Sequence, residues 1–127
     1  MPSYDASHHD PPAPVASVTL RDPDNPAAVA DHVLLMDTGA DVTLLPRAAI
    51  ERLGVKSAAD EHYELAAFDG TKSLASVAVV DMIFLNRVYR GRYLLIDAER
   101  GVLGRDVLNH LSLLLDGPGQ QWSEHKT

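Results

Sequence analysis

Short apolar runs separated by turn-forming residues restrict the fold of this sequence more than any other feature. The pair Asp69 and Gly70, between two such runs, predicts a tight hairpin. Turns that recur roughly every 8 to 12 residues are typical of all-β barrels and sandwiches. The sequence therefore predicts an all-β fold with strands at residues 15–20, 29–36, 63–67, 74–84, 93–96, 113–115 and 121–122, and short helices near residues 46–54 and 107–111.

The composition bounds the class of protein. The 127 residues are 46% hydrophobic and 23% charged, which is typical of one globular domain. The net charge of −7 argues against a nucleic-acid partner, because phosphate binding needs clustered positive charge. No run approaches the roughly 20 apolar residues of a membrane span, and no secretory signal is recognisable, so we expect a cytoplasmic protein without a membrane partner. The lack of cysteine excludes disulfides, thiolate zinc sites and cysteine nucleophiles.

The chain divides into a leader and one domain. Residues 1–14 contain four prolines, which block regular strand pairing, so this stretch is predicted to be a flexible, proline-rich leader. Within it, His8, His9 and Asp10 resemble metal ligands, but in such a stretch we expect them to be solvated and to bind no metal. The domain is predicted to span residues 15–127.

A carboxylate, a hydroxyl and a glycine follow the most apolar strand. Residues 33–36 predict a strand buried on both faces, and Asp37, Thr38 and Gly39 come directly after it. An ionised carboxylate at such a place needs hydrogen bonds or a proton shared with a partner. Asp37 is therefore a candidate catalytic group, although the same tripeptide also occurs in ordinary turns. A magnesium site at Asp37 and Asp41 is disfavoured, because no phosphate-binding loop is present.

A second apolar segment with a glycine lies further along the chain. Val102 and Leu103 precede Gly104 and Arg105, and a short helix is expected just after them. Together, this segment and the Asp-Thr-Gly loop resemble those of the retropepsins, the single-domain aspartic proteases of the retroviral type. The resemblance extends over most of the chain, in the order strand, catalytic loop, flap hairpin, glycine motif, helix and terminal strand. It implies a retropepsin-like closed β-barrel with a flap hairpin and one short C-terminal helix.

The resemblance also implies a role for each matching residue. Asp37 would be the catalytic carboxylate, Thr38 would hydrogen-bond between two facing loops, and Gly39 would offer its backbone to the substrate. Arg105 would pair with Asp41 and support the catalytic loop. The substrate groove and flap would include Leu35, Asp41, Leu44, Phe68, Asp69, Gly70 and Val102.

The sequence departs from the viral pattern in three places. The candidate flap has a single glycine, Gly70, which puts flap mobility in doubt. Arg100 stands where an apolar groove residue is usual; it either adapts the groove to acidic or polar side chains or points to solvent, and we expect the second. The segment that follows residue 115 resembles the terminal hairpins of bacterial retropepsin-like proteins and DNA-damage-inducible proteins, to which we expect the chain to be closer than to viral enzymes.

Aspartic proteolysis needs two carboxylates about 3 Å apart that share one proton. The chain has one Asp-Thr-Gly, so the second carboxylate must come from another copy. We therefore expect a homodimeric aspartic endopeptidase that acts on a peptide or protein substrate and uses no cofactor. The alternation of Leu111, Leu113 and Leu115 predicts an edge strand that pairs with its two-fold mate, or else completes the barrel of its own chain. The rival function is a catalytically silent, dimeric peptide-binding or scaffolding module with the same fold.

Overall fold

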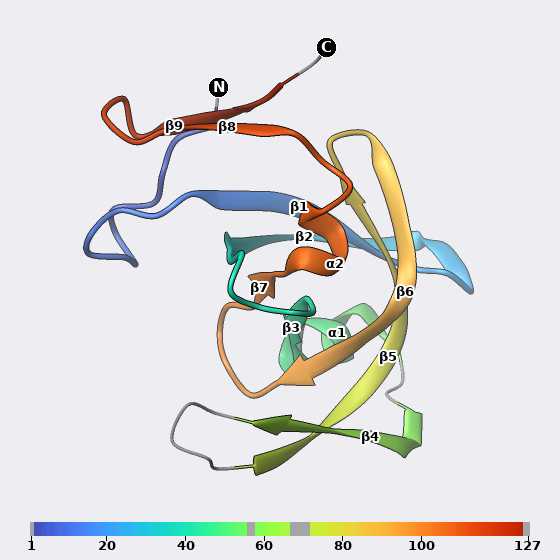
Figure 1. Ribbon diagram of the computed structural model, residues 1–127. Helices are drawn as coiled ribbons and strands as arrows, with labels where there is room; N and C mark the ends of the chain where they lie inside the picture. Colours follow the sequence, from blue (N-terminus) through green and yellow to red (C-terminus); the bar gives the residue numbers. More distant parts are fainter. Residues whose placement is uncertain (1, 56–57, 67–71, 126–127) are drawn as a thin grey trace.

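Strands dominate the structure, and the all-β prediction is confirmed (Figure 1). The computed structural model describes residues 2–55, 58–66 and 72–125. The strands are β1 (Val15–Asp22), β2 (Asn25–Met36), β3 (Leu44–Pro46), β4 (Ala58–Ala66), β5 (Lys72–Phe84), β6 (Arg87–Ile96), β7 (Val102–Leu103), β8 (Leu113–Asp116) and β9 (Gln121–Glu124), and the helices are α1 (Arg47–Leu53) and α2 (Arg105–Leu108). Neither of these described helices is long and apolar enough to cross a membrane.

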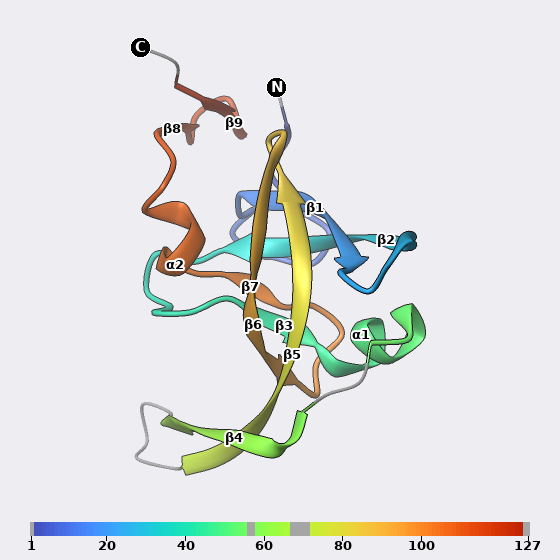
Figure 2. The ribbon, with the colours of Figure 1, turned by 90° about the vertical axis from the view of Figure 1, so that its right-hand side faces the viewer.

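Seven of the described strands form one sheet that closes on itself. Their order is β1-β2-β7-β3-β6-β5-β4, and β1 also pairs with β5, so that the pairing runs in a ring with β4 attached outside it. Two pairs, β2–β7 and β3–β6, are parallel, and the others are antiparallel. Figure 2 shows β7 and β3 in the middle of this arrangement, with the β4–β5 hairpin extending from one end.

The core fills the inside of the ring. Along β1, the side chains of Ala16, Val18 and Leu20 point inward and are buried, while those between them are partly or fully exposed. This alternation follows from the two-residue period of a strand. Fully buried side chains from β2, β3, α1, β5, β6 and β7 complete the core, among them Leu34, Leu45, Ile50, Met82, Leu95 and Leu103.

The two helices differ in how well the sequence predicts them. Helix α1 follows Pro46, and Gly54 ends it in the left-handed conformation with φ of 89°, as proline and glycine at these places predict. The bounds predicted for the second helix, residues 107–111, are wrong, because α2 begins two residues earlier. The carboxylate of Asp106 accepts the N–H of Val107 at 3.0 Å and so supports the earlier first turn.

A buried carboxylate joins the three strands at which the ring closes. Asp81 on β5 has no exposed surface and accepts hydrogen bonds from Arg21 on β1 and Arg90 on β6. The Nε and Nη2 atoms of Arg21 lie 3.1 and 2.9 Å from Oδ2 of Asp81, and Nε of Arg90 lies 2.6 Å from Oδ1. The Arg90 guanidinium, helped by Arg21, lowers the pKa of Asp81 to about 2 although burial opposes this change.

Strands β8 and β9 form a separate hairpin that packs on the ring through Trp122. This side chain is 2% exposed and its ring centroid lies 5.9 Å from that of Phe84. Its indole N–H donates to the carbonyl oxygen of Val15 at 2.9 Å, so the polar edge of the ring is also satisfied. The hairpin is therefore not part of the closed sheet, and β8 does not complete the ring of its own chain.

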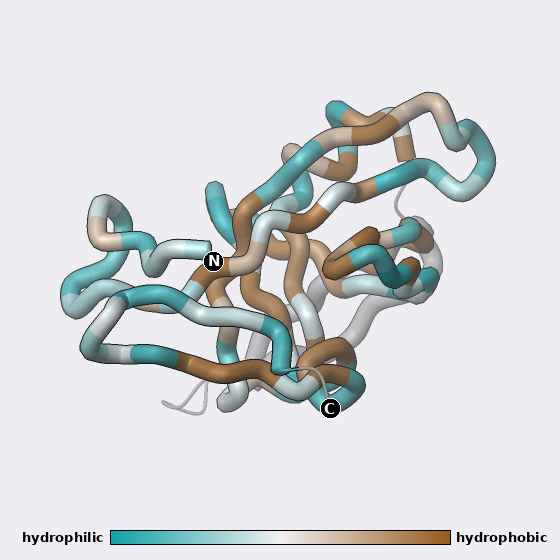
Figure 3. Tube along the Cα trace, turned by 90° about the horizontal axis from the view of Figure 1, so that it is seen from above, coloured by the Kyte–Doolittle hydropathy of each residue, from teal (hydrophilic) through white to brown (hydrophobic). Residues whose placement is uncertain are grey.

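The first described residues of the chain lie beside the start of β9, at the end of the molecule that Figure 3 views from above. The N–H of Tyr4 donates to the carbonyl oxygen of Gln120 at 2.9 Å, and the N–H of Trp122 donates to that of Pro2 at 3.0 Å. The flexibility predicted for residues 1–14 stays a prediction, but its premise that the prolines prevent pairing does not hold for residues 2–4. The β9 edge of the hairpin is thus paired with residues 2–4. The other edge, that of β8, has no strand beside it in the described part of the chain.

Candidate active site

Asp37 lies at the end of β2, where the chain leaves the sheet. Its N–H donates to the carbonyl oxygen of Leu103 at 3.0 Å, and its carbonyl oxygen accepts the N–H of Ala40 at 3.1 Å. The Oδ1 atom of its half-buried side chain accepts the N–H of Gly39 at 2.9 Å. A carboxylate that accepts a backbone N–H is held in one orientation, so this loop presents Asp37 in a fixed position.

Strand β2 and the short strands β3 and β7 meet behind this loop because a glycine lets their backbones approach. β7 pairs in parallel with β2 and in the antiparallel sense with β3. A Cβ atom at Gly101 would lie 1.9 Å from the carbonyl oxygen of Leu44, which is closer than any side chain permits. The carbonyl oxygen of Gly101 accepts the N–H of Leu35 at 3.1 Å. Glycine at position 101 therefore fixes the distance between the elements on either side of the site.

A buried hydroxyl anchors the far end of the loop that follows Asp37. Thr43 is 1% exposed, and its hydroxyl donates to Oδ1 of Asp106 at 2.7 Å and accepts the N–H of Gly104 at 3.0 Å. The N–H of Thr43 donates to Oδ2 of the same carboxylate at 3.0 Å. Neither Thr43 nor Asp106 is among the site residues predicted from the sequence. The only local signal is the position of Asp106, directly after Gly104 and Arg105.

Arg105 spans the loop from the other side. Its backbone N–H donates to the carbonyl oxygen of Ala40 at 2.9 Å, and its Nη1 donates to that of Thr38 at 2.7 Å. Its Nη2 lies 2.5 Å from Oδ1 of Asp41, so the structure brings together the two residues of the predicted support pair. The side chains of Arg105 and Asp41 are 41% and 84% exposed in the single chain. Such an exposed pair contributes about 1 kcal/mol or less unless another surface covers it.

The predicted apolar groove residues lie side by side. Val102 is opposite Leu35 in one ladder and opposite Leu44 in the other, and all three side chains are partly buried. By strand alternation, Leu35 is on the same face of β2 as Asp37 would be if the strand continued. An apolar surface therefore borders the carboxylate. The predicted flap residues Phe68, Asp69 and Gly70 lie outside the described residues.

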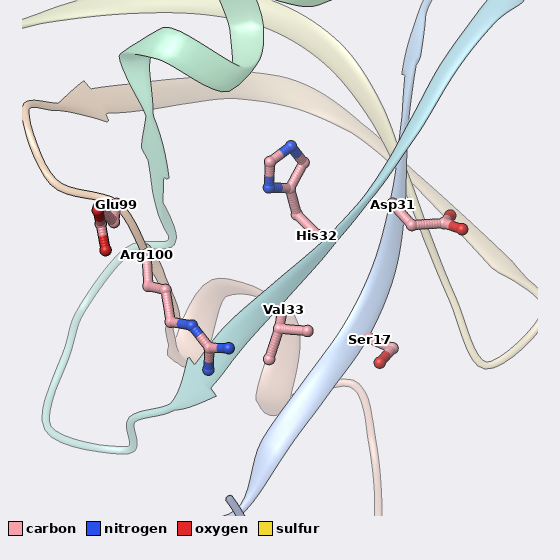
Figure 4. Close-up of a pocket in the computed structure, with 6 residues that line it drawn as sticks. All are labelled: Ser17, Asp31, His32, Val33, Glu99 and Arg100. Carbon is pink, nitrogen blue, oxygen red and sulfur yellow. The ribbon is translucent and has the colours of Figure 1, made fainter. Parts of the chain in front are cut away.

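Arg100 does not point freely into solvent, so the orientation that we expected from the sequence is wrong. Its side chain is 32% exposed, and Nη1 donates to Oδ2 of Asp5 at 2.6 Å. Arg100 also lines a pocket of about 240 Å3 beside β2, as Figure 4 shows, together with Ser17, Asp31, His32, Val33 and Glu99. Burial, with a smaller contribution from nearby Arg52, lowers the pKa of His32.

The metal-binding alternatives gain no support from the described residues. No group of three or more His, Asp or Glu side chains in residues 2–55, 58–66 and 72–125 is arranged to hold a metal ion. His8 instead places Nδ1 3.0 Å from Oδ2 of Asp5. Asp41, the second residue of the magnesium hypothesis, is engaged by Arg105.

Comparison with known proteins gives a match in structure rather than in sequence. No protein-family model and no curated protein matches this chain. Among solved structures, it is similar to the EIAV protease, a retroviral enzyme solved in complex with the inhibitor HBY-793. The two share 25% sequence identity with a TM-score of 0.59, over 77% of this chain and 86% of the other. The chain therefore has an all-β fold of the retropepsin type, that of the retroviral aspartic proteases.

Proposed function

We propose that the protein is a homodimeric aspartic endopeptidase whose two catalytic carboxylates are Asp37 from each chain. The observation that carries this proposal is the position of Asp37 at the end of β2, with its carboxylate held by the N–H of Gly39. A fold shared with a retroviral protease at 25% identity supports the same assignment. A binding module without activity would have no need for a carboxylate in this place.

The chemistry follows from a shared proton. When two carboxylates lie about 3 Å apart, only one of them ionises, so the pair contains one base and one acid. The ionised Asp37 takes a proton from a water molecule while the water oxygen attacks the peptide carbonyl carbon, and the protonated Asp37 donates to the carbonyl oxygen. As the C–N bond of the resulting gem-diol breaks, the Asp37 that took the water proton donates it to the leaving amine nitrogen. The other, now ionised Asp37 takes a proton from a hydroxyl of the gem-diol, so the products are a carboxylic acid and an amine, and the pair again shares one proton. Thr38 would hydrogen-bond between the two loops, and Gly39 would contact the substrate backbone.

The groove residues indicate the kind of peptide that is bound. Leu35, Leu44 and Val102 form an apolar surface beside Asp37. Burial of an apolar side chain on such a surface is favourable by about 25 cal/mol per Å2. We therefore expect apolar residues next to the cleaved bond.

The terminal hairpin supports a specific mode of dimerisation. Leu114 and Leu115 of β8 are 55% and 53% exposed, and the outer edge of β8 is unpaired among the described strands. An apolar open edge promotes pairing with another strand. Two β8 strands that pair about a two-fold axis would place these leucines beside their counterparts and join the hairpins of both chains. This hairpin also supports our proposal that the chain is closer to the bacterial retropepsin-like and DNA-damage-inducible proteins than to viral enzymes.

The test is digestion of a peptide library between pH 3 and pH 9, with sedimentation velocity on the same samples. The wild-type protein should sediment as a dimer and cleave at apolar sites, with a bell-shaped pH profile that belongs to the coupled pair. Asp37→Asn should sediment as the same dimer and cleave nothing, because the substitution keeps the volume and removes the shared proton. Asp97→Asn, which replaces an 82% exposed carboxylate outside this loop, is the control and should keep the wild-type cleavage.

Two results would contradict the proposal. Cleavage that persists in Asp37→Asn would show that another group does the chemistry, and activity that still rises through pH 9 would indicate a different nucleophile. A dimer that binds library peptides but cleaves none of them would favour the silent binding module.

A further inference from the structure

The guanidinium of Arg100 lies where the proposed groove continues past Leu35 and Val102. In a parallel ladder, paired residues point to the same face, and Leu35 pairs with Val102. Two residues back along each chain are Val33 and Arg100, which line the same pocket. Figure 4 shows the Arg100 side chain extended toward Val33. The strip that starts at Asp37 therefore passes from an apolar surface to a guanidinium within about 13 Å, four residues of strand.

Asp5 forms an ion pair with this guanidinium. The distance from Nη1 of Arg100 to Oδ2 of Asp5 is 2.6 Å, and the Asp5 side chain is 11% exposed. The same carboxylate accepts hydrogen bonds from the hydroxyl and N–H of Ser7 at 2.8 Å each and from the N–H of His8 at 3.1 Å. These bonds, with that of the Ser7 hydroxyl first, keep the pKa of Asp5 well below its usual range. These bonds therefore favour the ionised carboxylate and fix its orientation.

The backbone holds Asp5 in this place from two sides. Asp5 and Ala13 exchange both N–H to carbonyl hydrogen bonds, at 2.8 and 3.1 Å. The neighbouring Tyr4 bonds to Gln120, and the carbonyl oxygen of Pro14 accepts the N–H of Met36, the residue before Asp37. Residues 4–14 therefore form a strap from the terminal hairpin to the catalytic strand, and Asp5 is its contact with Arg100.

We propose that Asp5 is a positioning residue for substrate selection, which neutralises Arg100 and keeps it from binding acidic side chains of the substrate. This inference rests on the proposed function. The other acidic groups of the pocket do not replace Asp5: Asp31 is bonded to the hydroxyl of Thr19 at 2.7 Å, and Glu99 has an exposed side chain at the pocket edge. With Asp5 in place, the positive charge of Arg100 is paired with a carboxylate. Without it, Arg100 is available to a carboxylate of the bound peptide.

The test compares matched peptides that differ only by Glu or Gln. A cleavage site found in the library is varied at each of four positions on either side, and kcat and KM are measured for both members of each pair. In Asp5→Asn the ratio of kcat/KM for Glu to that for Gln should rise about two- to fivefold at the position that meets Arg100, as expected for one partly exposed ion pair. The rise should lie in KM rather than kcat and should shrink in high salt.

Two further variants separate charge from structure. Arg100→Met removes the cation, so the double variant Asp5→Asn/Arg100→Met should return to the ratio of Arg100→Met alone. Ser7→Ala removes a hydrogen bond to Asp5 and leaves the ion pair, so it should keep the wild-type ratio. An unchanged ratio in Asp5→Asn, as would follow if Arg100 turned to Glu99, overturns the inference. The inference is also overturned if Asp5→Asn lowers kcat/KM equally for the Glu and Gln peptides. It is overturned as well if Ser7→Ala raises the Glu to Gln ratio of kcat/KM as much as Asp5→Asn does.

Binding distinguishes this inference from the proposed function. The affinities of the peptide pairs are measured by fluorescence anisotropy in the Asp37→Asn background, where no cleavage is expected. If the library contains no cleavage site, the pairs are built on the library peptide that this variant binds most tightly. One outcome is that the wild-type protein cleaves no peptide, while the Asp5→Asn substitution still increases the affinity for the Glu peptide relative to the Gln peptide. The protease assignment then fails, and the role of Asp5 stands. If none of the peptides binds, both fail.

Discussion

Replacement of Asp81 by asparagine tests whether the charge cluster stabilises the closed ring. A carboxyl whose pKa falls from 3.8 to about 2 on folding stabilises the folded state by about 2 kcal/mol at neutral pH. Asp81→Asn removes this contribution and leaves Arg21 and Arg90 without their charged partner. Because these arginines are 28% and 62% exposed, water solvates them in part, and we expect a total loss of about 2 to 3 kcal/mol rather than the full cost of a buried unpaired charge.

The lowered pKa of Asp81 also predicts how its contribution to stability changes with pH. The folded-state pKa of Asp81 is lowered, so its contribution is complete above the unfolded value of 3.8 and is lost as the pH falls toward 2. At pH 3 the wild-type protein should have lost about 1 kcal/mol of this contribution, and Asp81→Asn none of it. The difference in unfolding free energy between the two proteins should therefore be smaller at pH 3 than at pH 7 by about 1 kcal/mol.

Urea unfolding at one protein concentration measures both the loss of stability in Asp81→Asn at pH 7 and the smaller loss at pH 3. The fluorescence of Trp122, the single and buried tryptophan, reports the transition. Asp97→Asn is the matched control, because Asp97 also pairs with an arginine, Arg47, but is 82% exposed; it should change stability by less than about 1 kcal/mol. A difference between wild type and Asp81→Asn that is the same at pH 7 and pH 3 would refute the reasoning.

Two other predictions concern the side chains that support the loop after Asp37. Thr43→Val leaves the buried N–H of Gly104 without its acceptor, so urea unfolding should show a loss of about 1 to 3 kcal/mol, whereas Thr19→Val, at a more exposed hydroxyl, should cost less. Arg105→Ala should lower the stability of the dilute single chain by about 1 kcal/mol or less, because its pair with Asp41 is exposed there. If the partner chain covers this pair, sedimentation should show a much larger loss of dimer in Arg105→Ala, and an unchanged dimer affinity would show that the pair lies outside the interface.

Features that depend on neighbouring residues were predictable from the sequence. The apolar run before Asp37 placed the candidate carboxylate at the end of a strand, and Gly54 marked the end of α1. Contacts between distant residues were not predictable in this way. Thr43 and Asp106 are separated by 63 positions, and a threonine within an apolar run gives no sign of its partner.

The N-terminal segment shows the same limit more sharply. Its prolines indicate correctly that residues 2–14 contain no long strand, but single backbone hydrogen bonds need none. The partner of Arg100 is Asp5, 95 positions away, and nothing near either residue relates them. The sequence marks Arg100 as unusual for its place, and only the folded chain identifies its partner.

The attachment of the terminal hairpin to its own chain has a consequence for how activity would respond to concentration. Trp122 is buried in the core of its own protomer, and Arg87 bonds to Glu124 at 2.6 Å, so β8 is already in place before a second chain arrives. On the proposed dimer, association then costs little ordering of the chain, and dilution yields folded protomers with one Asp37 each. Such protomers are idle rather than damaged. The amount of protein in its compartment would then act as the switch, with activity that rises as the square of concentration below the dissociation constant and returns fully when a diluted sample is concentrated again.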